Sequence, residues 1–131
     1  MREILFRGKQ IDNGEWVEGY YAAEPYTKNT YNYGYILENE KDLYAKKAYL
    51  VDSRTVGQFT GLTDKNGKKI FEGDIVDCLD YLGEVYYDPD GCYDLRDNTG
   101  EMRGDFIGTC HSREVIGNIH DNPDLLGGDD N

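Results

Sequence analysis

Long apolar runs are missing from this chain of 131 residues. A secretory signal peptide needs roughly 7–15 apolar residues in a row, and a membrane-spanning helix needs about 20. The first seven residues, Met-Arg-Glu-Ile-Leu-Phe-Arg, and the rest of the chain contain neither. We therefore expect a cytoplasmic protein that makes no contact with membranes.

Cysteines are few and badly spaced for metal binding or disulfides. Cys78, Cys92 and Cys110 form an odd set without a CxxC pair, as is typical of reduced thiols in the cytosol. A zinc site would have to combine them with His111 or His120. Structural zinc usually takes its ligands in close pairs, and neighbours on a strand face opposite sides of the sheet. We therefore expect no metal and no thiol chemistry.

Other signatures of catalysis are also lacking. No GxxxxGK[ST] or GxGxxG loop is present, so nothing predicts a phosphate cradle. The segments Asp64–Gly67 and Asp88–Gly91 place glycine at the fourth position, whereas a calcium loop needs it at the sixth, so they predict turns. The 26 acidic residues allow many chance carboxylate pairs, and none can be singled out. We expect no enzyme and no cofactor.

Basic residues are scarce, with 14 against 26 acidic ones and a net charge of −12. Phosphate backbones and anionic membrane surfaces repel such a chain. The composition therefore predicts no direct binding to nucleic acid, unless the basic residues gather at one place in the fold.

Aromatic side chains and glycine are abundant: 12 Tyr, 4 Phe, 1 Trp and 16 Gly. Aromatic residues favour the half-buried surface of a sheet, and scattered glycines favour tight turns over long helices. Short strands that reverse every eight to twelve residues are typical of a barrel or sandwich. The chain is therefore predicted to be mainly β.

The clearest single element is a hairpin of residues 2–7 and 15–21 that turns at Asn13-Gly14. Asn66-Gly67 predicts a second turn. Asn122 and Pro123 suit the start of a helical turn over 122–126. Asp52-Ser53 is expected to end a strand. The remaining strands are expected at 31–37, 48–51, 56–60, 75–76, 83–87, 92–95, 106–108 and 114–119.

Several of these segments carry a family resemblance. The chain resembles the YopX family of phage and prophage proteins at both ends and in the middle. The resemblance implies a β-rich fold with an SH3-like barrel element, an origin in a bacterial virus or prophage, and oligomers. The family is described by its fold, so it implies no catalytic residues. The matching segments are Arg2–Lys9, Trp16–Tyr21, Thr55–Leu62, Asp64–Gly67, Ile70–Val76 and Val115–Leu126.

These observations together predict a small SH3-like barrel with an N-terminal β-hairpin and a short C-terminal helical turn. We expect a single YopX-like domain over residues 1–126, followed by a tail at 127–131. Within the domain we expect the hairpin at 1–22, a variable segment at 23–53 and the barrel-like part at 54–126.

The tyrosines near the N-terminus exceed what one face of a small sheet can bury. They favour either packing between neighbouring strands or a surface for self-association or ligand binding between subunits, because tyrosine combines an apolar body with a polar tip. The tyrosines in question are Tyr20, Tyr21, Tyr26, Tyr31, Tyr33 and Tyr35.

The predicted function is that of a phage accessory protein that binds without catalysis, as a homo-oligomer, with a host protein as a further candidate partner. Two alternatives stay open. The net charge suits an acidic inhibitor that mimics nucleic acid. Aromatic residues combined with arginines suit a protein that sequesters a nucleotide, with Arg7, Arg54, Arg96 or Arg113 as phosphate partners.

Overall fold

The structure is a computed structural model, and it describes residues 5–23, 33–37, 48–78, 82–87, 93–96, 102–106 and 113–126. Strands dominate these residues, so the predicted mainly-β class is confirmed. No helix among the described residues is long and apolar enough to cross a membrane. In chain order the strands are β1 (Phe6–Gln10), β2 (Trp16–Ala23), β3 (Tyr33–Leu37), β4 (Ala48–Thr63), β5 (Lys69–Phe71), β6 (Asp74–Asp77), β7 (Leu82–Tyr87), β8 (Tyr93–Arg96), β9 (Met102–Phe106) and β10 (Glu114–Asn118).

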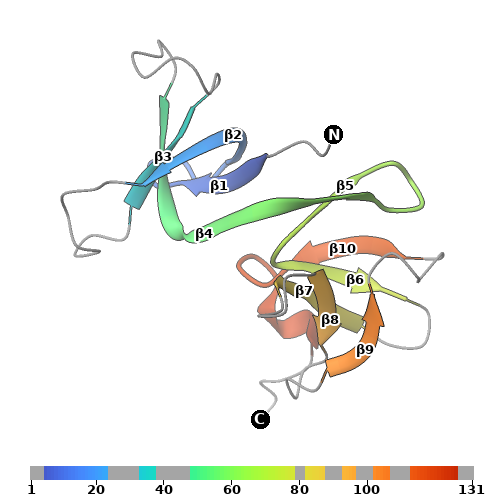
Figure 1. Cartoon of the computed structure of the whole chain (residues 1–131). Coiled ribbons are helices and arrows are strands. Elements are labelled where there is room, and N and C mark those ends of the chain that lie inside the picture. Colours follow the sequence, from blue (N-terminus) through green and yellow to red (C-terminus); the bar gives the residue numbers. More distant parts are fainter. Residues whose placement is uncertain are drawn as a thin grey trace. The chain divides into compact units, whose positions relative to one another are not determined.

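The chain forms two compact units, unit 1 at Met1–Phe59 and unit 2 at Thr60–Asn131. Strand β4 belongs to both, because its last residues lie beyond the division (Figure 1). The single domain expected over 1–126 stays a prediction.

Unit 1 begins with the predicted hairpin, which is confirmed as β1 and β2. Gly14 has a φ of 73°, a conformation that glycine adopts without strain. Its N–H donates to the carbonyl of Gln10 at 3.0 Å and closes the turn. The Asn-Gly pair thus reverses the chain where the sequence indicated.

The predicted barrel takes the form of a ring of strands. Strand β2 pairs with β3, β3 pairs with β4, and β4 pairs back with β1, all antiparallel. Each of the four strands therefore pairs with two neighbours over part of its length, which limits the edge open to other chains. We expected the barrel-like part over 54–126, whereas the described pairings that close a ring lie in unit 1.

The inside of the ring is apolar and tightly packed. Ile36 and Val51 are fully buried there. The ring of Tyr21 stacks on that of Phe6, with centroids 5.9 Å apart. Tyr21 also covers Gly34, where an added Cβ would lie 2.7 Å from the tyrosine ring. Only glycine allows this close approach between β2 and β3.

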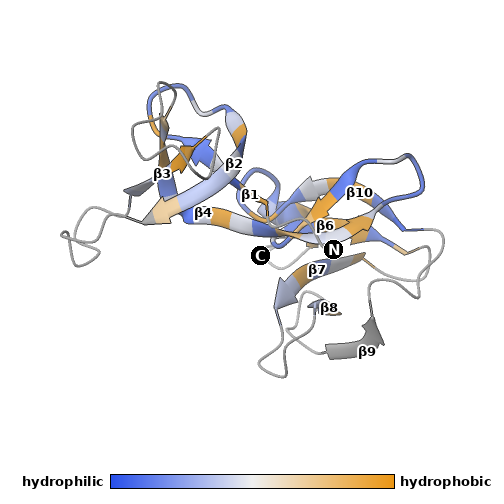
Figure 2. Ribbon diagram, turned by 45° about the horizontal axis from the view of Figure 1, so that its top comes forward, coloured by the Kyte–Doolittle hydropathy of each residue, from blue (hydrophilic) through white to orange (hydrophobic). Residues whose placement is uncertain are grey.

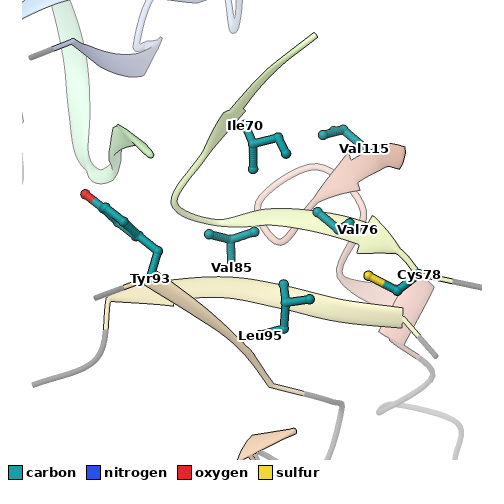
Figure 3. Packing of buried hydrophobic residues seen from close by; sticks show 7 residues of the cluster. All are labelled: Ile70, Val76, Cys78, Val85, Tyr93, Leu95 and Val115. Atoms are coloured by element: carbon teal, nitrogen blue, oxygen red, sulfur yellow. The ribbon is translucent and has the colours of Figure 1, made fainter. Parts of the chain in front are cut away.

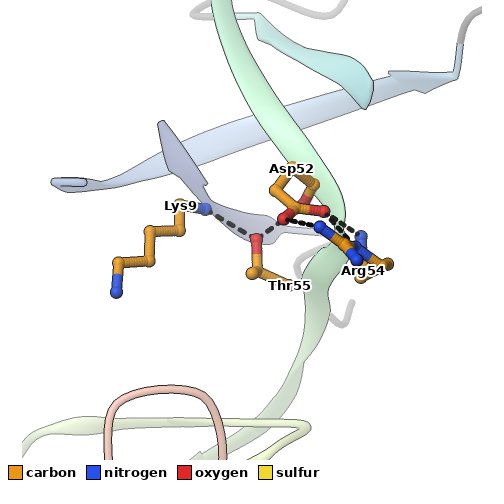
Figure 4. Close-up of polar contacts among 4 residues, drawn as sticks. All are labelled: Lys9, Asp52, Arg54 and Thr55. Carbon is orange, nitrogen blue, oxygen red and sulfur yellow. Dashed lines mark hydrogen bonds and ion pairs between the residues drawn. The ribbon is translucent and has the colours of Figure 1, made fainter. Parts of the chain in front are cut away.

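Strand β4 corrects one prediction from the sequence. We expected two strands separated at Asp52-Ser53, but the structure has one strand of 16 residues. The Asp52 carboxylate accepts from the backbone and side chain of Arg54. Thr55 Oγ1 donates to the Asp52 carbonyl and accepts from the Lys9 N–H (Figure 4). These bonds satisfy the polar groups of a bulge, so the strand continues through it.

Unit 2 contains a sheet in the order β10-β6-β7-β8-β9. Apolar segments of β6 and β10 are orange in Figure 2. Buried side chains of unit 2 form the core cluster that Figure 3 shows. Leu62, near the end of β4, packs against this cluster. The cluster consists of Ile70, Val76, Cys78, Val85, Tyr93, Leu95 and Val115.

Two turns of unit 2 depend on buried polar side chains. Asp74 is 1% exposed, and its Oδ2 accepts the N–H of Phe71 at 2.8 Å. Gly73, with a φ of 94°, donates its N–H to the carbonyl of Val85. This arrangement turns the chain sharply from β5 into the buried strand β6. The predicted turn at Asn66-Gly67 is also confirmed, with Gly67 at a φ of 84°.

The C-terminal helical turn is confirmed as a short 3-10 helix, η2 (Pro123–Leu126). Asn122 does not cap it in the expected way. Its Oδ1 accepts from the N–H of Asn118, while its carbonyl accepts from the N–H of Leu125. Asn118 Oδ1 in turn accepts from the N–H groups of His120 and Asp121. The two asparagines thus brace the loop between β10 and η2.

Candidate functional site

Successive side chains on the ring strands point to opposite sides of the sheet, and this divides the tyrosines into two groups. Tyr21 points inward, and burial raises the pKa of its phenol. Tyr20, Tyr33 and Tyr35 alternate with inward-facing residues and point outward. Tyr26 and Tyr31 lie outside the described residues. Packing between strands therefore applies to Tyr21, whereas a surface for self-association or ligand binding stays a prediction for Tyr20, Tyr33 and Tyr35.

The outward side of β2, β3 and β4 carries two complete cross-strand rows without a charged residue. One row joins Tyr20, Leu37 and Ala48, and the other joins Ala22, Tyr35 and Leu50. We call these six positions the uncharged face. None of them is buried, and Leu50 is 41% exposed. In a chain whose residues are 31% charged, such a surface stands out.

Charged side chains begin at the next row around the ring. There Tyr33 lies opposite Asp52, Asp52 opposite Lys9, and Lys9 opposite Trp16. Arg7 lies over the indole of Trp16, with its Cζ 4.8 Å from the ring centroid. An apolar centre with a charged rim is the anatomy of a protein interface.

The geometry of this surface favours contact. The rings of Tyr33 and Tyr35 meet edge to face with centroids 6.2 Å apart, which restricts both side chains before any partner arrives. Tyrosine loses little conformational entropy on binding and contributes large contact area. Sequence reasoning singled out the tyrosines but missed Leu37 and Leu50. Their alternation with Ile36 and Val51 was the available signal.

The two units differ sharply in charge. Unit 1 has eight basic and nine acidic residues, a net charge of −1. Unit 2 has six basic and 17 acidic residues, a net charge of −11. The uncharged face thus belongs to the nearly neutral unit.

The four arginines proposed as phosphate partners are already engaged in different places. Arg7 lies on Trp16 and Arg54 forms a fork with Asp52 in unit 1. Arg96 pairs with Glu84 at 3.3 Å and covers the ring of Tyr86 in unit 2. The Nε of Arg113 donates to the carbonyl of Thr63. Each of the four arginines thus already has a partner within its own unit.

The structure also shows where two of the candidate metal ligands lie. Cys78 is buried in the core of unit 2. The N–H of His120 is part of the loop braced by Asn118. Cys92, Cys110 and His111 lie outside the described residues. Among the residues that the structure describes, no three His, Cys, Asp or Glu side chains gather around a common point.

One carboxylate in unit 2 has a perturbed pKa. Burial of Asp64 acts to raise its pKa, but the N–H groups of Val115, Lys68 and Asn66 and the charge of Lys68 outweigh it and hold the pKa below its usual value. All three N–H groups lie 2.9–3.0 Å from the carboxylate. Asp64 therefore organises the turn after β4 and is not poised for proton transfer.

These features define an all-β protein of paired antiparallel strands with an uncharged face on its first unit. The chain belongs to the YopX family, whose family model, described as "YopX protein", matches residues 5–127. The resemblance expected from the sequence is thereby confirmed.

One solved structure is similar over nearly the whole chain. It is the crystal structure of protein EF1440 from Enterococcus faecalis, with 23% sequence identity and a TM-score of 0.57. The alignment covers 96% of this chain and 99% of the other. At that identity the likeness shows a shared fold. No curated protein matches the chain.

Proposed function

We propose that this protein is a phage or prophage accessory protein that acts by binding, without catalysis, and that it assembles with copies of itself through the uncharged face. The observation that carries the proposal is the pair of cross-strand rows on β2, β3 and β4, six outward positions without a charge. Its expected location is the cytoplasm.

A second copy is the partner that fits this face best. Copies that met through unit 2 would bring two net charges of −11 together, whereas unit 1 carries only −1. Self-repulsion of that size opposes close approach. In a two-fold contact the same patch serves both partners, so the row of Tyr35 and Leu50 would meet its own equivalent.

The composition of the face also suits an interface. A stable interface buries about 800 Å² on each partner, and a few central aromatic residues carry most of its energy. Tyr20 and Tyr35 supply the aromatic centre. The ion pair of Arg54 with Asp52, 2.8 Å long, belongs to the polar rim.

Sedimentation velocity at tens of micromolar protein tests the proposal. The wild type should sediment as an oligomer, and Leu50→Asp should sediment as a monomer, because it places a charge in the centre of the contact. Ile116→Asp is the matched control, since Ile116 is 39% exposed and lies in unit 2. A wild type that is strictly monomeric, or equal loss in both variants, would overturn self-association.

The two alternative functions receive less support. For an acidic mimic of nucleic acid, the charge of unit 2 is favourable. However, Asp64, Asp74 and Asp94 are buried, and Glu84 and Glu114 lie beside cations. A nucleotide binder lacks a place where its arginines converge. Thermal shift with a nucleotide panel checks the second alternative, since a ligand at 100 times its Kd stabilises by about 2.7 kcal/mol.

A further inference from the structure

The basic residues of unit 2 gather at one end of a hairpin. Lys65, Lys68 and Lys69 lie in or directly after the turn that joins β4 to β5, and Arg113 lies beside the base of that turn. The N–H of Lys65 donates to the carbonyl of Arg113 at 3.1 Å, and Arg113 Nε donates to the carbonyl of Thr63 at 3.0 Å. We call these four cations the basic tip. They are four of the six basic residues in the unit.

Two carboxylates lie at the tip. Asp64 is 7% exposed, its Oδ1 accepts the N–H groups of Asn66 and Lys68 within the turn, and its Oδ2 accepts the N–H of Val115 in β10. Its negative charge is directed into the protein. Glu114 Oε1 lies 3.4 Å from Lys65 Nζ. The tip thus brings four cations together beside these two carboxylates.

The shape of the tip suits a polymer that approaches from outside. Residues 65–69 are all exposed. No atom lies within 4 Å of the position that a Cβ on Gly67 would occupy, so the apex is open. Behind the apex stand two paired strands, and the DNA major groove is wide enough, at about 12 Å, to admit a two-stranded ribbon.

We propose that the basic tip contacts the phosphate backbone of nucleic acid. The net charge of the chain predicts repulsion, but salt screens charges beyond about 8 Å at physiological ionic strength, so the groups nearest the phosphates decide the contact. Lysines act there as mobile point charges, which hold a backbone without reading its sequence. Here the condition stated by the composition, that basic residues gather in space, is met.

Nucleic acid is a better partner for the basic tip than the acidic unit 2 of a second copy of the chain. Duplex DNA presents one charge per roughly 1.7 Å of axis. In contrast, the carboxylates of Asp64, Asp74 and Asp94 are buried in unit 2 and cannot serve as a docking surface. Contact with up to four phosphates is weak for a single chain. Self-assembly through unit 1 would present several tips to one polymer and raise the overall affinity.

Fluorescence anisotropy with a labelled DNA duplex and a labelled single strand tests the proposal. From about 50 to about 200 mM salt, two to four phosphate contacts should lower the affinity about 10- to 150-fold. The variant Lys65→Gln/Lys68→Gln/Lys69→Gln should bind at least about tenfold more weakly at the lower salt concentration. The variant Lys41→Gln/Lys46→Gln/Lys47→Gln changes the net charge equally within unit 1 and should bind as the wild type does.

Three results would overturn the proposal: no binding to either probe at the lower salt concentration, equal loss in both triple variants, or displacement of the DNA by polyglutamate as effectively as by unlabelled DNA. The last result would assign the tip to acidic proteins. Circular dichroism of the triple variants confirms folding. Sedimentation of Leu50→Asp is a separate measurement on unit 1, so failure of self-association and failure of the basic tip can be told apart.

Discussion

The two units of this protein build antiparallel sheets from similar residues but divide the chemistry between them. Unit 1 is nearly neutral, closes its strands into a ring and turns tyrosines outward. Unit 2 holds almost all of the net charge, leaves its sheet open and fixes its turns with buried aspartates. One unit is thus suited to contact through apolar surface and the other to contact through charge.

The units also differ in what stabilises their turns. In unit 1 the turn between β1 and β2 is closed by backbone bonds of Gly14 and Gln10. In unit 2 the carboxylates of Asp64 and Asp74 accept backbone N–H groups. Buried carboxylates make a turn specific, but they also make it sensitive to substitution and to acid.

The largest effect on stability is expected from Asp74→Ala. The change leaves the buried N–H of Phe71 without its acceptor, which costs up to about 3 kcal/mol. Urea unfolding followed by circular dichroism measures this loss. Trp16, the single tryptophan, lies in unit 1 and reports on that unit by fluorescence.

If the two signals separate in Asp74→Ala, the units unfold independently. If they shift together, the single domain expected over 1–126 holds. Asp124→Ala is the control, because Asp124 is exposed and should change stability by less than about 0.5 kcal/mol. Equal midpoints in the two variants would contradict the structural role of Asp74.

A smaller loss is expected from Gly34→Ala in unit 1. The new methyl group would lie 2.7 Å from the ring of Tyr21, and overpacking of this kind costs about 1–3 kcal/mol. The transition of Trp16 fluorescence in urea should move to lower concentration. Ala48→Ser, at an exposed position of the neighbouring strand β4, should leave the urea midpoint unchanged. An unchanged midpoint for Gly34→Ala would show that Tyr21 can move aside.

The smallest effect is expected from Asp64, and it is measured as a change in how stability depends on pH. Its pKa is lower in the folded state than in the unfolded state, where it is about 3.9. The carboxylate therefore stabilises the fold above that value, and this stabilisation is lost as the pH falls through the lower, folded pKa. Unfolding midpoints measured from pH 6 down to pH 2 (about the range concerned) should fall less steeply in Asp64→Asn than in the wild type. Parallel curves would contradict the assignment.

Features that depend on neighbours in sequence were predictable. The turns at Asn13-Gly14 and Asn66-Gly67 follow from the left-handed conformation that glycine allows. The short helical turn follows from Pro123 at its first position. Each of these signals acts within a few residues, so the sequence alone is sufficient.

Features that depend on distant contacts were not predictable. The ring closes because β1 pairs with β4 about fifty residues away, and no local pattern encodes that partner. Asp52 was interpreted as the end of a strand, since its side chain usually favours turns, but here it satisfies a bulge. Without the register of β3 on β4, Leu50 could not be placed beside Tyr35.

The candidate surfaces show the same limit. The outward tyrosines were visible as an excess, and three lysines near Asn66 were visible as a run. The sequence could not show that Arg113 joins those lysines, because a hydrogen bond across fifty residues brings it there. The two candidate surfaces thus depend on which strands pair more than on short sequence motifs.

Strand β4 has an evolutionary consequence. It completes the ring of unit 1 through β1 and β3, and in unit 2 it supplies the partner of β5 and the packing of Leu62. The chain crosses from one unit to the other within a paired strand and without a linker. We therefore expect the two units to be inherited together, because a recombination break within β4 would remove a paired strand from both.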